Sequence, residues 1–123
     1  MRLPSGLLGF ESVKEYVLTG RLEEAPFLWL QRPDDPSLAF LVVPPGEVIA
    51  DYQPNIPATD AEFLGLQTPE DALLLNIVTL HSDGHATVNL KGPIVLNRST
   101  WVGKQSVPTN AADYSTQHPL PTA

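Results

Sequence analysis

Residues 89–97 read NLKGPIVLN, and this stretch is the strongest indication of the fold. Apolar residues alternate on both sides of a glycine–proline pair, as in a β-strand with one buried face. Proline lacks the amide hydrogen that a sheet needs and glycine has no side chain to pack, so both are unusual inside a strand. The apolar spacing stays even through Gly92 and Pro93, which predicts one strand bent at this pair with the same side toward the core; a surface loop is the alternative. The positions with this spacing are Val88, Leu90, Ile94 and Leu96.

The segment just before it, residues 72–90, has the pattern of a β-hairpin. Two runs of apolar and β-branched residues flank Asp83 and Gly84, which supply the positive φ angles of a two-residue turn. One face of this hairpin is largely apolar and the other is mixed, as in the wall of a small antiparallel barrel or sandwich. The predicted pairs are His81 with Ala86, Leu80 with Thr87, Thr79 with Val88, Val78 with Asn89, Ile77 with Leu90 and Asn76 with Lys91.

Prolines divide the rest of the chain into short elements. There are 13 of them among 123 residues, which is about twice the usual share of roughly 5%. The composition therefore predicts a mainly β protein, a small antiparallel β-barrel-like domain over residues 1–107 with one or two short helices. Residues 108–123 are expected to form a polar tail that docks in part on the barrel through Tyr114 and Leu120. Further strands are expected over residues 15–19, 26–31, 38–43, 48–52 and 98–107.

Residues 57–66 are the best candidate for a helix. Thr59 is followed three residues later by Glu62, the spacing of a capping box in which both side chains bond to free amide groups. Phe63 and Leu66 are three residues apart, so both would then face the core from one side of the helix. Pro69 limits this helix to about two or three turns.

The composition also restricts the kind of partner and compartment. The chain has no cysteine, which excludes disulfides, thiolate metal sites and cysteine nucleophiles. The sequence shows neither a signal peptide nor an apolar run of about 20 residues, so we expect a cytoplasmic protein that does not bind a membrane. A formal net charge of −7, with scattered lysines and arginines, argues against direct nucleic-acid binding and would attract a basic protein partner.

The residues that could act in catalysis or metal binding are expected to have structural roles instead. His81 and His85 point to opposite faces of the predicted hairpin, so we do not expect them to share a metal. The acidic pairs, such as Glu70-Asp71, fall in predicted turns and helix starts, where carboxylates act as turn formers and caps. The sequence has neither a phosphate-binding glycine loop nor a nucleophile elbow. We therefore expect a protein that is not an enzyme and uses neither a cofactor nor a metal.

Several motifs, in order along nearly the whole chain, resemble the FliW family of flagellar assembly factors. They are GLLGFE (6–11), PFLWLQ (26–31), LAFLVVPP (38–45), NLKGPIVLN (89–97), GKQ (103–105) and DYSTQHPL (113–120). The most specific is the NLKGPIVLN core with the glutamine that follows it in GKQ. The positions that match the family motifs are Gly9, Phe10, Phe27, Leu30, Gln31, Asn89, Pro93, Ile94, Asn97, Gln105 and Tyr114.

The resemblance implies a small bacterial protein that works by binding other proteins. Family members bind newly made flagellin, and they bind the translational repressor CsrA and keep it off flagellin messenger RNA. When flagellin accumulates it captures the FliW-like protein and CsrA is released, so the regulation is a switch of partners. Two alternatives stay open from the residues alone: a small-ligand-binding β-barrel with a closed apolar cavity, and an enzyme with a buried carboxylate of shifted pKa.

Two groups of residues are candidates for these contacts. An acidic patch is expected to face CsrA, and an exposed apolar groove is expected to hold the amphipathic terminal helices of flagellin. The acidic candidates are Asp60, Glu62, Glu70 and Asp71, and the apolar candidates are Phe10, Phe27 and Trp101. A third group is expected to be structural, with its amides bonding to the backbone at the bend; its members are Asn89, Gly92, Pro93, Asn97 and Gln105.

Two features depart from the family pattern. Family members usually carry a further strand before the GLxGFE motif, whereas this chain begins almost at the motif. We therefore expect one barrel strand to be missing, replaced or supplied by a neighbour. In addition, Gln117 stands before HPL, where the family often has an arginine, so any ion pair made by that arginine is lost.

Overall fold

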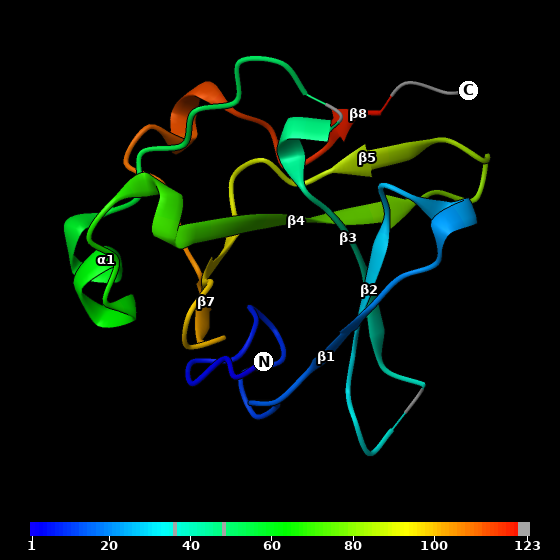
Figure 1. Cartoon of the computed structure of the whole chain (residues 1–123). Coiled ribbons are helices and arrows are strands. Elements are labelled where there is room, and N and C mark those ends of the chain that lie inside the picture. The colour runs from blue at the N-terminus through cyan, green and yellow to red at the C-terminus, as the bar shows by residue number, and fades with distance from the viewer. Residues whose placement is uncertain (36, 48, 121–123) are drawn as a thin grey trace.

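The computed structural model describes residues 1–35, 37–47 and 49–120, and it is built mainly of antiparallel strands (Figure 1). The strands are β1 (Val17–Thr19), β2 (Leu28–Gln31), β3 (Ala39–Val43), β4 (Ala72–Leu80), β5 (Ala86–Val88), β6 (Ile94–Asn97), β7 (Gly103–Gln105) and β8 (His118–Pro119). The described residues contain one α-helix, α1 (Ala58–Leu64), and the 3₁₀ turns η1 (Leu22–Glu24), η2 (Pro45–Glu47), η3 (Pro69–Asp71) and η4 (Ala111–Asp113). The predicted fold class, mainly β and barrel-like with a short helix, is confirmed.

The N-terminal residues bring two edges of the sheet together. The strand order is β1-β2-β3-β4-β5-β8, and β6 pairs with β4 and with β7. Arg2 makes one bridge to Glu15, just before β1, and another to Val102, just before β7. The amide of Arg2 also donates to the carbonyl of Trp101 at 2.9 Å. The N-terminal segment is therefore connected to the residues just before β1 and β7 through single bridges and not through a full ladder.

The long strand β4 organises the fold because two later strands lie along one of its edges. β5 pairs with the second half of β4 and β6 with the first half. The carbonyls of Ile77 and Asp71 accept hydrogen bonds from the amides of Asn89 and Arg98, at 2.9 Å each. Carbonyls an even number of residues apart point to the same side of a strand, so β5 and β6 share one edge of β4.

The NLKGPIVLN stretch connects these two strands through a bulge, so the chain does bend at the glycine–proline pair. Asn89 still bonds to Ile77, but Ile94 already pairs with Leu75. Residues 90–93 therefore lie opposite a single residue of β4, Asn76. The side-chain Nδ2 of Asn76 donates to the carbonyl of Asn89 at 2.9 Å and so closes the mouth of the bulge.

The prediction that the same side faces one core on both sides of the bend is wrong. Val88 and Leu90 belong to one buried cluster, whereas Ile94 belongs to another. Side chains alternate along a strand with a period of two, and the bulge inserts an odd number of extra residues. The even-numbered positions consequently change face as the chain passes from β5 to β6.

The hairpin between β4 and β5 has a register one residue away from the predicted one. The amide of His81 donates to the carbonyl of His85 at 2.9 Å, so the loop is residues 82–84. Within this loop only Gly84 takes a left-handed φ, 93°. This is the common three-residue hairpin loop that ends in a glycine of this conformation. The observed pairs are Val78 with Val88, Thr79 with Thr87 and Leu80 with Ala86.

The stretch expected as a strand over residues 48–52 is not one where the structure describes it. Residue 48 lies outside the described residues, and residues 49–52 belong to no strand. Asp51 takes a left-handed φ of 62° there, which an extended strand does not allow. Ile49 and Tyr52, two of the residues that suggested a strand, instead pack as single side chains against a buried cluster.

The capping box predicted for the helix does not form. Pro57 precedes α1 and no side chain caps the first turn, so Thr59 and Glu62 lie inside the helix and not across its start. A capping box occurs further along the chain, between Thr68 and Asp71 at η3. A threonine followed three residues later by an acidic residue therefore occurs twice, and the pair next to the proline at the start of η3 is the one that forms a cap.

The buried face of α1 also differs from the predicted one. Phe63 is exposed, and Leu66 lies beyond Gly65, which ends the helix in the left-handed conformation. The buried residues are Asp60 and Leu64, one turn apart. A polar residue thus occupies the inner face that the apolar pattern assigned to Phe63.

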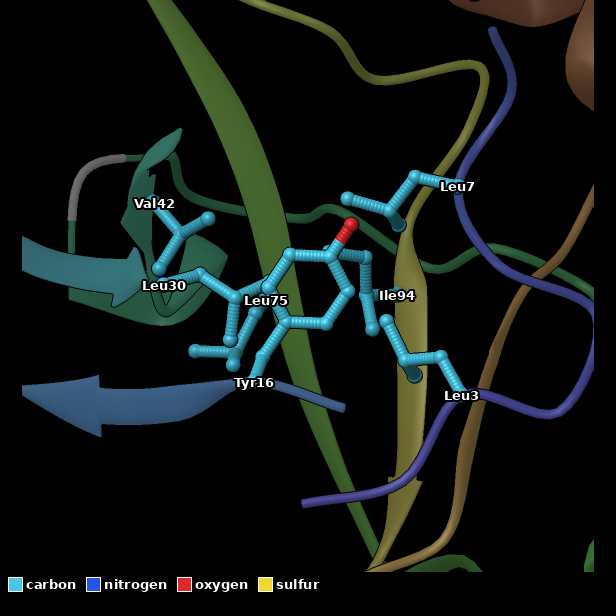
Figure 2. Close-up of a cluster of buried hydrophobic side chains, with 7 residues drawn as sticks. All are labelled: Leu3, Leu7, Tyr16, Leu30, Val42, Leu75 and Ile94. Atoms are coloured by element: carbon cyan, nitrogen blue, oxygen red, sulfur yellow. The ribbon is translucent and has the colours of Figure 1, made fainter. Parts of the chain in front are cut away.

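Two buried clusters lie on opposite faces of the sheet, because neighbouring residues of β3 alternate between them. Val42 belongs to the first cluster and Val43 to the second. Figure 2 shows the first cluster, in which the Tyr16 ring lies among apolar side chains from β2, β3, β4, β6 and the N-terminal segment. The cluster is Leu3, Leu7, Tyr16, Leu30, Val42, Leu75 and Ile94.

The end of the described chain packs on the second cluster. β8 pairs with β5, and Leu120 is buried there. The ring of Tyr114 meets that of Tyr52 edge-on at 4.8 Å between centroids. Gln117 is exposed, and its backbone N–H donates to the Ser115 hydroxyl at 3.0 Å. The expected fraying of the last residues falls on 121–123, outside the described residues.

Candidate interaction surfaces

Amide side chains join the bulge to the N-terminal segment. Oε1 of Gln105 accepts from the amide of Leu8 at 2.8 Å, and its Nε2 donates to the carbonyl of Gly92 at 3.1 Å. Oδ1 of Asn89 accepts from the amide of Lys91 at 2.9 Å. A side chain on Gly92 would begin 3.0 Å from Nε2 of Gln105, so the glycine makes room for this amide. Both amide side chains therefore bond to backbone groups at the bulge.

Asn97, at the other end of the NLKGPIVLN stretch, connects α1 to the turn between β6 and β7. Its Nδ2 donates to the carbonyl of Leu64, the last residue of α1, at 2.8 Å. Its Oδ1 accepts from the amides of Ser99 at 2.8 Å and Thr100 at 3.3 Å. The side chain is buried, so these three contacts replace the water that its amide would otherwise bind.

An open groove, here called the motif groove, lies over the bulge. Its volume is about 480 Å³, and it forms where the GLLGFE and NLKGPIVLN segments meet. Leu8 and Val107 line it and are 85% and 69% exposed. Large apolar side chains left exposed beside a groove are typical of binding surfaces for proteins. Its polar lining includes Asn89, Lys91 and Gln105.

Asp60, expected in an exposed acidic patch, is only 6% exposed. Lys104 forms an ion pair with its Oδ1, and the Ser106 hydroxyl donates to its Oδ2 at 2.6 Å. Burial acts to raise the pKa of Asp60, but the hydrogen bonds from Lys104 and Ser106 outweigh it and the pKa lies below its usual value. The carboxylate therefore holds α1 against β7, and its burial corrects the expectation that Asp60 belongs to an exposed acidic patch.

This ion pair predicts a pH-dependent stability. Because the folded state lowers the pKa of Asp60, its contribution is complete above the unfolded value of about 3.9 and is lost as the pH falls through the lower folded value. We expect Asp60→Asn to lower the free energy of unfolding by about 2 kcal/mol at neutral pH. Denaturant unfolding of both proteins between about pH 7 and pH 2 should show this difference shrinking below about pH 4. A difference that stays constant over that range would contradict the role of the ionised carboxylate.

The other acidic candidates divide into one structural residue and two exposed surface carboxylates. Oδ2 of Asp71 accepts from the amides of Thr68 and Gln67, at 2.9 Å each, and these bonds lower the pKa of Asp71. Glu62 on α1 and Glu70 on η3 are exposed. We call these two residues the acidic surface.

The three apolar candidates do not gather in one groove. Phe10, in the N-terminal segment, packs edge-on against Phe40 at 5.1 Å between ring centroids. Trp101 lies in the turn between β6 and β7, with a left-handed φ of 57° and an exposed ring. Phe27 precedes β2 and packs against the second buried cluster. They contact different parts of the molecule.

A second groove, here called the tryptophan groove, was not found from the sequence. It has a volume of about 390 Å³. Its residues come from separate elements, so no local sequence pattern indicates it. The predicted register also paired Leu80 with Thr87, whereas the structure pairs Leu80 with Ala86. It is lined by Phe27, Trp29, Leu41, Leu80 and Ala86, with Glu23 and Glu24 at its side.

The histidine pair at the hairpin tip has a different arrangement from the predicted one. The rings of His81 and His85 stack with centroids 4.2 Å apart, where opposite faces were expected. Nε2 of His81 lies 2.9 Å from the Thr87 hydroxyl, and Nδ1 of His85 pairs with Asp83. Among the residues that the structure describes, no three histidine, aspartate or glutamate side chains come together in a way that could hold a metal.

No helix in the described ranges is both long and apolar enough to span a membrane.

Comparison with known proteins identifies the family. The sequence model of the family described as FliW protein matches residues 1–120. The flagellar assembly factor FliW of Geobacter sulfurreducens is 42% identical over 119 residues, which cover 96% of this chain and 74% of that protein. The FliW of Moorella thermoacetica is 37% identical over 123 residues, covering 98% of this chain and 77% of that protein.

A solved structure agrees with these sequence matches. A crystal structure of the flagellar assembly factor FliW superposes with a TM-score of 0.85 at 33% sequence identity, covering 98% of this chain and 84% of that one. The family match extends over both motif segments that build the motif groove, and the fold match covers nearly every described residue. The chain therefore belongs to the FliW family of flagellar assembly factors.

Proposed function

We propose that this protein is a non-enzymatic assembly factor of the bacterial cytoplasm that binds flagellin and, when flagellin is scarce, the translational repressor CsrA. Membership of the FliW family supports a role in flagellar assembly. The observation that carries the proposal is the motif groove, because the segments that build it are also those that define the family resemblance. Its exposed Leu8 and Val107 offer apolar contacts to a protein segment.

Flagellin and CsrA are proposed to exclude one another. Flagellin would occupy the motif groove through an amphipathic helix, and CsrA would meet the acidic surface of Glu62 and Glu70. The net charge of −7 favours a basic, RNA-binding partner such as CsrA and speeds its encounter. Captured CsrA would be kept from flagellin messenger RNA, and rising flagellin would release it to repress translation.

Size-exclusion chromatography of the purified proteins tests this switch. We expect a complex with each partner alone and release of CsrA when flagellin is added in excess. Leu8→Asp places a charge in the motif groove and should weaken flagellin binding at least about tenfold. A stable complex of all three proteins would reject the exclusion, and failure to bind both partners would reject the function.

Charge reversal tests the acidic surface. Glu62→Lys combined with Glu70→Lys should weaken CsrA binding by about fivefold and reduce its dependence on salt, because exposed charges act mainly on encounter. Asp71 is left unchanged because its carboxylate caps η3. The control is Glu15→Lys with Asp113→Lys, an equal change of charge at exposed positions elsewhere. Isothermal titration that gives equal losses for both double variants would show that only net charge matters.

A further inference from the structure

The tryptophan groove is a surface of the kind that binds proteins, and the proposed function does not use it. Trp29 is 36% exposed and Leu80 is 65% exposed, although both line a groove whose floor continues into the second buried cluster through Phe27, Leu41 and Ala86. Figure 1 shows η1, which forms its side, next to the ends of β2 and β4. Tryptophan is one of the residues enriched among those that contribute most to binding at protein interfaces.

The backbone around this groove favours a helix over an extended peptide. β2 pairs with β1 and β3, β3 pairs with β2 and β4, and β4 pairs with β3 and β5. These strands therefore offer no free edge inside the groove to which a peptide could add as a strand. An incoming extended segment would leave its own amides and carbonyls unpaired, whereas a helix satisfies them internally.

The charges at the groove favour a basic ligand. Glu23 and Glu24 are exposed at its side, and among the residues that the structure describes no lysine or arginine lines it. Within the described residues neither glutamate belongs to an ion pair, and Arg21 lines the adjoining hollow beyond Trp29. Cations on the ligand would therefore find unpaired carboxylates at the groove, in the field of a protein with a net charge of −7.

We propose that the tryptophan groove binds an amphipathic helix of a protein partner, with apolar side chains against Trp29 and Leu80 and with lysine or arginine beside Glu23 and Glu24. The proposal does not depend on the identity of the flagellar partners. It adds a second docking surface, built by η1 and strands β2 to β5, to the motif groove built by the N-terminal segment and the bulge.

A designed peptide and the fluorescence of Trp29 test this proposal directly. The probe is a synthetic helical peptide with leucines on one face and lysines flanking them; the control peptide has glutamate in place of each lysine. The protein is the full chain with Trp101→Phe, which leaves Trp29 as the only tryptophan. We expect a saturable blue shift of the emission with the lysine peptide, weakened several-fold between about 50 and 300 mM salt, and binding at least about tenfold weaker with the glutamate peptide.

Matched leucine variants locate the site. Leu80→Ser should weaken binding of the lysine peptide at least about tenfold, and Leu8→Ser, which removes an exposed leucine from the motif groove, should leave it unchanged. Glu23→Gln with Glu24→Gln should weaken binding several-fold and flatten its salt dependence. The proposal is overturned if the emission does not change, if both peptides bind equally well, or if Leu8→Ser weakens binding as much as Leu80→Ser.

Discussion

Asn97→Ala is expected to lower the free energy of unfolding by about 3 kcal/mol. The substitution removes the acceptor of the Ser99 and Thr100 amides and the donor to the carbonyl of Leu64. The carbonyl of Leu64 would be left without a partner in a buried place, which costs roughly 1–3 kcal/mol. The amides of Ser99 and Thr100 would also lose a partly buried acceptor, so the link between α1 and the turn between β6 and β7 is removed. Urea unfolding followed by circular dichroism measures the change.

Asn89→Ala provides the matched control, because it removes the asparagine at the other end of the same motif. Oδ1 of Asn89 accepts from the amide of Lys91 at an exposed position, where water can replace it. We expect a loss of about 1 kcal/mol. Equal losses for the two variants would mean that the buried contacts of Asn97 contribute no more than an exposed turn, which would contradict the role assigned to Asn97.

Gly103→Ala is expected to destabilise the protein by about 2–3 kcal/mol through overpacking. A methyl group there would lie 2.9 Å from Cδ2 of Leu3, 3.0 Å from Cδ1 of Leu96 and 3.0 Å from the carbonyl oxygen of Val95. Leu3 and Leu96 are fully buried, so neither side chain can move into open space. Leu3 also follows the residue that bridges to Val102, so the added methyl should loosen the contact between the N-terminal segment and β7.

Gly46→Ala makes the same chemical change where no atom lies within 4 Å of the new methyl group. Its backbone is outside the left-handed region, so alanine restricts the unfolded chain without straining the folded one. We expect its stability to be unchanged or higher by up to about 1 kcal/mol. Thermal unfolding should place Gly103→Ala several degrees below this control. A melting temperature for Gly103→Ala equal to that of the control would show that the sheet can open at this point.

The sequence predicts the elements of this fold better than their registers. The hairpin before NLKGPIVLN was predicted from Asp83 and Gly84, and a hairpin is present there. Whether two or three residues form its loop depends on small differences between turn types. The loop has one residue more than predicted, so every pair in the hairpin differs from the predicted pair, and His81 stacks on His85. The register in turn determines that Leu80 and Ala86 share the tryptophan groove.

The candidate site was predictable where the reason is local. Gln105 and Asn89 were expected to bond to the backbone at the bend, since amides beside a kinked strand have unpaired main-chain groups within reach. Asp60 was expected in an exposed patch because an acidic residue there would attract a basic partner. Its partners, Lys104 and Ser106, come more than forty residues later, so nothing near Asp60 in the sequence indicated that it would be buried.

The sequence alone determined the mainly β composition, the bend at Gly92-Pro93 and the family, because these depend on residue types and spacings within short stretches. The tertiary structure decided which faces those strands bury, how residues 1–3 connect β1 to β7, and where the two grooves lie. The physical reason is the period of two along a strand: an odd insertion in the bulge or a one-residue change in a loop reverses which side chains face the core. Only the packing of distant segments against each other selects between those alternatives.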